Sequence, residues 1–541
     1  MLRRAWKPLV GTAVLVGVPS YIYRRYSSRS ETFDLSIRER GPDGKSVVMT
    51  RSFPLLSKEQ TNARLSEHAA TQTTTRPDGM RWNHATAHLA SNSPIEDAHA
   101  SAIIPRDPTD PASPGDFLFF TVMDGHGGPH TSKLLSNVLI PAITLELYQR
   151  MKDSSATSQP TGMMEWLKSL IYPSAATPSP FDADPSRVSR AFQDAFLRLD
   201  TEIVNAPLRL LAEHIDKLDI QKNAIPDLSQ HPMAMASMLP ALSGSCAIMA
   251  MFDTARQHLY VACTGDSRAV AGVYEEAEDG RGTWRVQPLS EDQTGRNPAE
   301  VKRIQSEHPP DEADTVVMRG RVLGGLEPTR AFGDARYKWP REVQAILNEA
   351  FLKGNNHPMR STPSLLKTPP YVTAQPFVVQ SELPFRSRPD QPTPSGTKST
   401  LRFLVLATDG LWDELSSEEV VALVGGHLAG LKGTIPKSSL PGLVPMSSNS
   451  QAMNGKNKHR SKDAEKGSWA FVDDNVGTHL IRNALGRGDE EMLRQLVSIP
   501  APHSRSYRDD ITVTVVWWQD GRENEAKADT FKPEQKLKSK L

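Results

Sequence analysis

Carboxylates lie at the ends of four apolar runs that have the composition of buried strands. The runs span residues 117–123, 259–264, 401–408 and 511–518 and are rich in Val, Leu, Phe, Thr and Trp. The acids at their ends are Asp124, Asp266, Asp409 and the pair Asp509 and Asp510. If neighbouring strands are antiparallel, an acid after one strand and an acid before the next lie at the same edge of a sheet. The sequence therefore predicts a carboxylate cluster.

Such a cluster has a chemical consequence. Several carboxylates packed together repel one another, which raises their pKa values or requires a cation between them. An all-oxygen site suits Mg²⁺ or Mn²⁺ better than zinc. A lone Asp after a strand is more often a turn or cap residue. Four such coincidences in one chain favour a divalent-cation site over that simpler explanation.

The elements that must position these acids include helices as well as strands. Asp184 and Pro185 are typical of an N-cap and a first helical position. The apolar residues that follow recur at three- and four-residue spacing, as expected for a helix: Val188, Ala191, Phe192, Ala195, Phe196 and Leu199. Strand runs mixed with helices, without strict alternation, predict a layered α+β domain.

Composition divides the rest of the chain. We expect a folded domain over residues 80–518, preceded by a loosely ordered lead-in at 31–79 and followed by a charged tail at 519–541. Segments rich in Pro, Ser, Thr or Lys and poor in periodicity predict three insertions, near residues 152–184, 354–400 and 433–467.

The first 30 residues have the charge pattern of a mitochondrial targeting segment. Six basic residues precede the first acid, Glu31. The apolar stretch 9–23 is shorter than the roughly 20 residues that cross a bilayer, and Pro19 interrupts it. The run 24–28, Arg-Arg-Tyr-Ser-Ser, resembles a presequence cleavage site. We expect import into the matrix and removal. Retention as an inner-membrane anchor through residues 9–23 is the alternative, and the arginines after the apolar part disfavour a secretory signal.

Charge and cysteine content exclude other classes. Lys plus Arg and Asp plus Glu both total 63, so the formal net charge is zero and nothing in the composition supports nucleic-acid binding. Cys246 and Cys263 have no zinc-binding or redox spacing, and we interpret both as small core residues.

Seven segments, taken in order, resemble the PPM (type 2C) protein phosphatases over roughly residues 80–518. They are Ser-Asn-Ser-Pro-Ile-Glu96-Asp97, Val-Met-Asp124-Gly125-His126-Gly-Gly, Ser243-Gly-Ser-Cys, Thr-Gly-Asp266-Ser-Arg, Arg330-Ala-Phe-Gly-Asp334, Ala-Thr-Asp409-Gly-Leu-Trp-Asp413 and Arg508-Asp509-Asp510-Ile-Thr-Val. The resemblance implies a central β-sandwich of two antiparallel sheets flanked by α-helices. It also implies two Mg²⁺ or Mn²⁺ ions at one end of the sandwich, with a third, weaker ion in some relatives.

The same resemblance implies the metal ligands. Asp124 would bridge both ions, and the Gly125 carbonyl would complete one coordination sphere. Asp409 and Asp509 would bind the other ion. The assignment of Asp509 rather than Asp510 is part of this prediction.

Further acids take secondary roles by the same comparison. Glu96 and Asp97 match acids that hold metal-bound waters. Asp266 and Asp413 match acids that bind the additional ion.

The implied mechanism rests on the ions and on one histidine. A water bridging two divalent cations becomes hydroxide at neutral pH and attacks a phosphate monoester. His126 matches the general acid that protonates the leaving oxygen, because its unperturbed pKa of about 6.5 lets it carry a proton near neutrality.

Two positions depart from the family pattern. Asn92 stands where most members place the Arg that grips the substrate phosphate, so the phosphate-binding position is altered. Cys246 stands where Thr is usual, which we interpret as a packing variant.

The departure at Asn92 points to one branch of the family. Asn92 to Asp97 and Leu326 to Trp339 resemble the pyruvate dehydrogenase phosphatase branch. We therefore expect a protein serine/threonine phosphatase that acts on phosphoserine or phosphothreonine of a mitochondrial protein, with the E1α subunit of the pyruvate dehydrogenase complex as substrate and partner. The alternatives are another mitochondrial phosphoprotein as substrate, or an inactive scaffold of the same fold.

Overall fold

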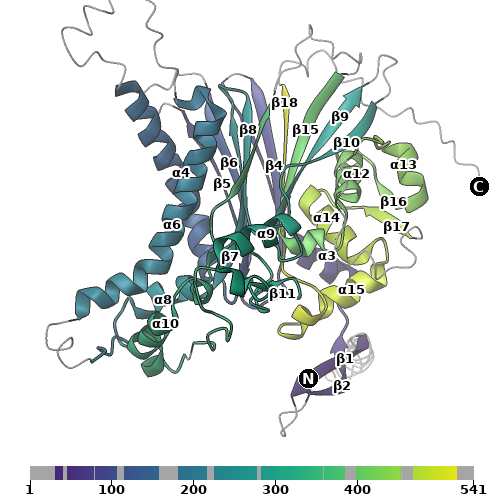
Figure 1. Cartoon of the computed structure of the whole chain (residues 1–541). Coiled ribbons are helices and arrows are strands. Elements are labelled where there is room, and N and C mark those ends of the chain that lie inside the picture. The colour runs from purple at the N-terminus through teal and green to yellow at the C-terminus, as the bar shows by residue number, and fades with distance from the viewer. Residues whose placement is uncertain are drawn as a thin grey trace, which may run out of the picture.

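A computed structural model describes residues 31–40, 46–77, 79–106, 115–156, 181–215, 224–276, 282–357, 359–383, 398–450, 453 and 467–520. Two antiparallel sheets pack face to face, with helices on the outer side of each (Figure 1). The first sheet has the order β10 (Gly282–Pro288), β9 (Arg268–Glu276), β15 (Lys398–Ala407), β18 (Ile511–Asp520), β4 (Met80–Leu89), β3 (Ala70–Thr75). The second has the order β14 (Phe377–Glu382), β8 (His258–Thr264), β7 (Gly244–Asp253), β6 (Asp116–His126), β5 (Ala98–Pro105), and β13 (Phe332–Gly333) pairs with β7.

The two-residue period of the strands separates two cores. Leu118 and Phe120 of β6 point between the sheets, where they pack with Leu404 of β15 and Val516 of β18. Phe117 and Phe119 point outward and join the core formed with the covering helices. The four apolar runs that preceded or followed acids are thus strands, as predicted, and the α+β sandwich is confirmed.

Helices cover the outer face of each sheet. On the second sheet lie α4 (His130–Ala156) and α6 (Pro185–His214), and α8 (Ala234–Leu242) packs against both of them and β13. On the first sheet lie α3 (Lys58–Ser66), α12 (Ser417–Leu428) and α14 (Val476–Gly486), and α15 (Glu490–Ser498) packs against α3 and α14. The predicted cap of α6 is confirmed, because the Asp184 side chain accepts a hydrogen bond from the Ser186 amide at 2.9 Å and Pro185 is the first helical residue.

The remaining elements lie in the connections. The strands are β1 (Thr32–Arg40), β2 (Ser46–Pro54), β11 (Val317–Met318), β12 (Arg321–Val322), β16 (Gly433–Pro436) and β17 (Ser468–Phe471). The α-helices are α9 (Pro298–Glu307), α10 (Arg341–Leu347), α11 (Asp409–Trp412) and α13 (Leu440–Leu443), and η5 (Asn348–Leu352) is a π-helix. The 3-10 turns are η2 (Phe181–Ala183), η3 (Pro310–Glu312), η4 (Ala335–Tyr337), η6 (Lys353–Asn355), η7 (Lys437–Ser439) and η9 (His503–Ser506).

The lead-in at 31–79 differs from the expectation of loose order. β1 and β2 pair along their whole length, and α3 begins with a capping box formed by Ser57 and Gln60. Leu65 of α3 is fully buried in the core beneath the first sheet, and β3 forms the edge of that sheet beside β4. The folded part therefore begins well before residue 80. β3 escaped prediction because its sequence, Ala-Thr-Gln-Thr-Thr-Thr, lies exposed at an edge and needs no apolar face.

The expected insertions also contain packed structure where they are described. In the third, β16 pairs with β17, and Leu440 and Val444 are buried. In the second, Tyr371 and Val372 are buried and β14 joins the sheet. The central parts of all three, at 157–180, 384–397 and 454–466, lie outside the described residues.

The predicted targeting segment and most of the charged tail also lie outside the described residues, including the apolar stretch 9–23. Within the described part of the chain, no helix has the length and apolar character needed to cross a membrane. Cys246 and Cys263 are both buried and unpaired, as predicted for core residues.

Candidate active site

The predicted carboxylate cluster forms where strands of both sheets end. Asp124 is near the end of β6, Asp266 follows β8, and Asp409 follows β15. One carboxylate oxygen from each of the three lies within 4.8 Å of the others. β6 and β8 belong to one sheet and β15 to the other, so the cluster requires the two sheets to be packed together.

The cluster opens into a cavity of about 1220 Å³. Its wall includes the cluster together with Asp413, Asp509 and Asp334. It also includes five arginines, Arg296, Arg321, Arg336, Arg360 and Arg505. The cavity thus combines a group of acids that could bind cations with basic groups that could bind an anion.

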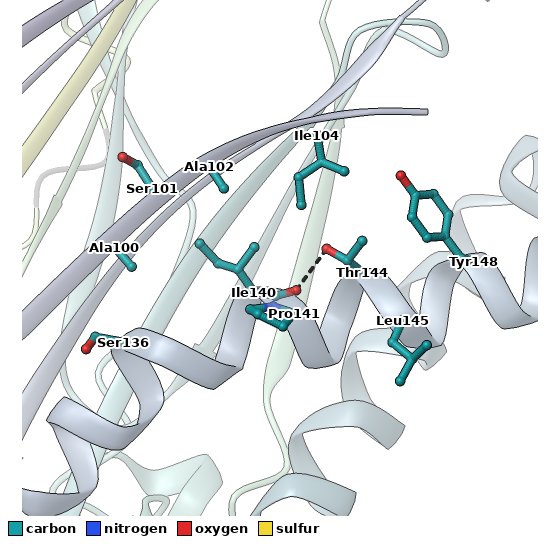
Figure 2. Close-up of a pocket in the computed structure, with 10 residues that line it drawn as sticks. All are labelled: Ala100, Ser101, Ala102, Ile104, Ser136, Ile140, Pro141, Thr144, Leu145 and Tyr148. Atoms are coloured by element: carbon teal, nitrogen blue, oxygen red, sulfur yellow. Dashed lines mark hydrogen bonds between the residues drawn. The ribbon is translucent and has the colours of Figure 1, made fainter. Parts of the chain in front are cut away.

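A second hollow, of about 510 Å³, lies between β5 and α4. Figure 2 shows Ile104, Ile140 and Tyr148 around it, with Thr144 Oγ1 donating to the Ile140 carbonyl at 2.9 Å. Its lining contains no carboxylate, imidazole or basic group. This hollow therefore cannot provide the acid cluster's chemistry.

The electrostatics of the cluster are those of a cation site. Burial raises the pKa of Asp124 well above its usual range, and the neighbouring Asp409, Asp97 and Asp266 carboxylates raise it further. Burial and the nearby Asp510 likewise raise the pKa of Asp97. Ionising these groups together is costly unless positive charge lies between them. The oxygen-only donor set therefore fits Mg²⁺ or Mn²⁺.

The residues beside the cluster hold it in a fixed geometry. The Asp97 side chain is buried and accepts a hydrogen bond from Thr408 Oγ1 at 3.0 Å. At Gly125 any side chain would collide with the backbone, because a Cβ atom would lie 2.0 Å from the Glu96 carbonyl oxygen. The strand that carries Asp124 can approach the Glu96 loop this closely only through glycine.

His126 has a carboxylate partner, Asp334. Its Nε2 is 2.6 Å from Asp334 Oδ2. Burial opposes protonation of the imidazole, but the Asp334 carboxylate, together with Asp266 and Glu96, outweighs burial, so the pKa of His126 is raised. Asp334 adopts a left-handed conformation with φ +48°, and its amide donates to the Ser243 carbonyl at 3.0 Å. The Asp334 carboxylate therefore favours the protonated form of His126.

Asn92 does not occupy the position that the sequence suggested. Its Nδ2 donates to Asp510 Oδ2 at 2.9 Å, its backbone amide donates to Asp510 Oδ1 at 2.9 Å, and it is not part of the cavity wall. Asp510 also accepts from the amides of Ser91 and Glu96. The prediction of Asn92 as a phosphate-binding residue is thus not supported, because its amide serves to bind a buried carboxylate.

Comparison with known proteins agrees with this geometry. Residues 196–432 match the family described as protein phosphatase 2C. A protein phosphatase 2C homologue of Schizosaccharomyces pombe is 34% identical over 464 residues, which is 84% of each chain. The chain belongs to the protein phosphatase 2C family. It is accordingly a protein serine/threonine phosphatase.

Two further relatives of this phosphatase have a stated substrate. The mitochondrial pyruvate dehydrogenase (acetyl-transferring) phosphatase 1 of Saccharomyces cerevisiae is 33% identical over 485 residues, 87% of this chain and 74% of that one. The human mitochondrial pyruvate dehydrogenase phosphatase 2 is 33% identical over 448 residues, 80% of this chain and 76% of that one.

The structure of this phosphatase brings the predicted ligands to one cavity, but the place of Asp266 differs from the prediction. Asp266, expected to bind a weaker ion, lies in the tight group with Asp124 and Asp409. Asp509 and Asp413 line the same cavity. Asp510 accepts hydrogen bonds from the 91–96 loop and is not among the residues that line this cavity.

Sequence reasoning gave no role to two functional candidates of this phosphatase. Asp334 was part of a quoted motif, but its pairing with His126 joins residues 208 positions apart. Arg505, whose Nη1 forms an ion pair with Asp509 Oδ1, had no distinguishing signal beyond its position four residues before Asp509.

Proposed function

We propose that this phosphatase uses divalent cations bound at Asp124, Asp266, Asp409 and Asp509 to hydrolyse phosphoserine or phosphothreonine of a mitochondrial protein. The observation that carries the proposal is the group of three carboxylates within 4.8 Å of one another at a cavity wall. Asp413 would bind a further, weaker ion in the same cavity. The carbonyl of Gly125 and the carboxylates of Glu96 and Asp97 would support the first ions directly or through water.

The bound cations would lower the pKa of the attacking water and offset the charge of the phosphoryl oxygens. The residues of the chain contribute position and a proton. Asp124 and Asp409 come from opposite sheets, so their spacing is fixed by the packing of the sandwich. His126, held by Asp334 at 2.6 Å, keeps the proton that the leaving seryl or threonyl oxygen requires.

The proposed substrate is the phosphorylated E1α subunit of the pyruvate dehydrogenase complex. Its support is the similarity to the two pyruvate dehydrogenase phosphatases over most of each chain. Both relatives are mitochondrial, and the basic segment that precedes Glu31 fits the same location. We therefore propose action in the matrix, with attachment to the inner membrane through residues 9–23 as the alternative if that segment is retained.

The substrate proposal is tested by comparing E1α phosphorylation in mitochondria with and without this protein. E1α should be more phosphorylated without it, and the wild-type chain, but not an Asp124→Asn chain, should reverse the change. Unchanged E1α phosphorylation would refute this substrate. A phosphoproteome from the same samples would then show which other matrix phosphoprotein accumulates.

A further inference from the structure

The phosphatase lacks an arginine at position 92, and the Asn92 amide is already bound to Asp510. The phosphate of the substrate therefore needs another basic partner. We propose that Arg505 binds the substrate phosphate at this site. This inference rests on the proposed function, because it assumes that a phosphate is held at the acid cluster.

Hydrogen bonds fix the segment that carries Arg505 against the loop that carries Asn92. Ser504 Oγ donates to the Ser91 carbonyl at 2.5 Å, and Ser91 Oγ donates to the Arg508 carbonyl at 2.8 Å. Ser504 and Ser91 are both buried. Arg505 is thereby placed beside the same loop from which an arginine at position 92 would start, although it comes from the other end of the chain.

The Arg505 side chain faces the site. It lines the cavity with Asp124, Asp409 and Asp509, and 47% of it is exposed. Its Nη1 forms an ion pair with Asp509 Oδ1. A guanidinium has five N–H donors, so one carboxylate oxygen leaves donors available for an anion. A phosphate held at the acid cluster would lie next to these donors.

Three of the other four arginines of the cavity wall have different partners. Arg296 Nη1 and Arg321 Nη2 share the Glu327 carboxylate at 2.8 and 2.6 Å. Arg336 Nη2 donates to the Ser361 carbonyl at 2.6 Å. Arg505 is instead ion-paired to Asp509, a proposed cation ligand. Its guanidinium could grip phosphate oxygens in the bidentate manner that lysine cannot.

The test compares wild type with Arg505→Gln and Arg505→Lys in the presence of saturating Mn²⁺. The measurements are KM for p-nitrophenyl phosphate, the inhibition constant of inorganic phosphate, and the rise in Tm that phosphate causes. Arg505→Gln should raise both constants about tenfold or more, the loss expected for a charge-assisted hydrogen bond, and should abolish the Tm shift. The values for Arg505→Lys should lie between those of wild type and Arg505→Gln, because lysine keeps the positive charge but lacks the planar guanidinium.

A matched control is Arg198→Gln on α6, which removes another exposed, ion-paired arginine outside the cavity. It should leave all three measurements unchanged. An Arg505→Gln enzyme with wild-type constants for phosphate would overturn the inference. So would a defect confined to the Mn²⁺ concentration needed for activation, since Arg505 would then only organise Asp509. A wild-type chain inactive with Mn²⁺ would instead overturn the proposed function on which the inference rests.

Discussion

Asn92 and Asp510 are joined side chain to side chain, with Asn92 Nδ2 donating to Asp510 Oδ2 at 2.9 Å. The Asp510 carboxylate is buried, and its remaining partners are the backbone amides of Ser91, Asn92 and Glu96. One carboxylate thus shapes the whole loop that precedes the acid pair Glu96 and Asp97. Asn92 therefore has a structural role, as a hydrogen-bond donor to the Asp510 carboxylate.

Replacing Asn92 should therefore lower stability. Asn92→Ala removes one hydrogen bond to a buried charge, which we expect to lower the free energy of unfolding by about 1–3 kcal/mol. Urea denaturation with metal removed measures this. The control Asn137→Ala removes an exposed amide that bonds only to the Lys133 carbonyl of its own helix, and it should change stability little. Equal stability of the Asn92→Ala and wild-type proteins would contradict the structural role.

Asp124→Asn should separate activity from stability. We expect nearly complete loss of phosphatase activity, because a cation ligand is removed. Without metal, the variant should unfold at a higher temperature than wild type, because the raised pKa of Asp124 reflects burial and repulsion from Asp409, Asp97 and Asp266. Thermal unfolding in EDTA and phosphate release at saturating Mn²⁺ measure the two effects. A variant that keeps wild-type turnover would exclude Asp124 as a ligand.

Asp509→Asn should mainly affect activity, whereas Asp510→Asn should mainly affect stability. Asp509 lines the cavity, so its loss should reduce turnover and raise the Mn²⁺ concentration needed for activation while the protein stays folded. Asp510 is buried and accepts hydrogen bonds from the 91–96 loop, so its loss should mainly lower Tm. Full activity of Asp509→Asn, together with metal-binding loss in Asp510→Asn, would reverse the assignment.

A group of three histidines, His68, His88 and His99, should make the stability of the protein depend on pH. Burial, followed by the like charges of His68 and His99, lowers the pKa of His88 from 6.5 to about 4, against a raising influence of Asp510. The unfolded chain then binds more protons than the folded one between these values, so stability should fall as pH drops from about 6.5 towards 4. His88→Gln should make the fall of Tm over this range less steep. An unchanged slope in the variant would refute this contribution.

Much of the fold was predictable because burial imposes a regular pattern. The four apolar runs are largely buried strands, and α6 begins at Pro185 after the N-cap Asp184, a pair that leaves a clear local signal. The same regularity placed Asp124, Asp266 and Asp409 at one edge of the sandwich. A strand that is held at a sheet edge by backbone pairing alone needs no apolar pattern. The exposed strand β3 was missed for that reason.

Contacts between distant segments could not be predicted from local pattern. The Asp334 carboxylate meets His126 across 208 positions of the chain, and Ser504 meets Ser91 across 413 positions. The altered role of Asn92 has the same origin, because its partner Asp510 lies 418 positions away. Residue type and family resemblance identified candidate ligands, but the tertiary structure decides which of them face the cavity.

The central claim is that the acid cluster holds divalent cations on which hydrolysis depends. Its most direct test is phosphate release from an intact, phosphorylated pyruvate dehydrogenase complex by the purified chain, measured with Mn²⁺, after EDTA, and after Mn²⁺ is restored. We expect activity with Mn²⁺, none after EDTA, and recovery on restoration. Phosphate release that persists undiminished in EDTA would contradict the claim.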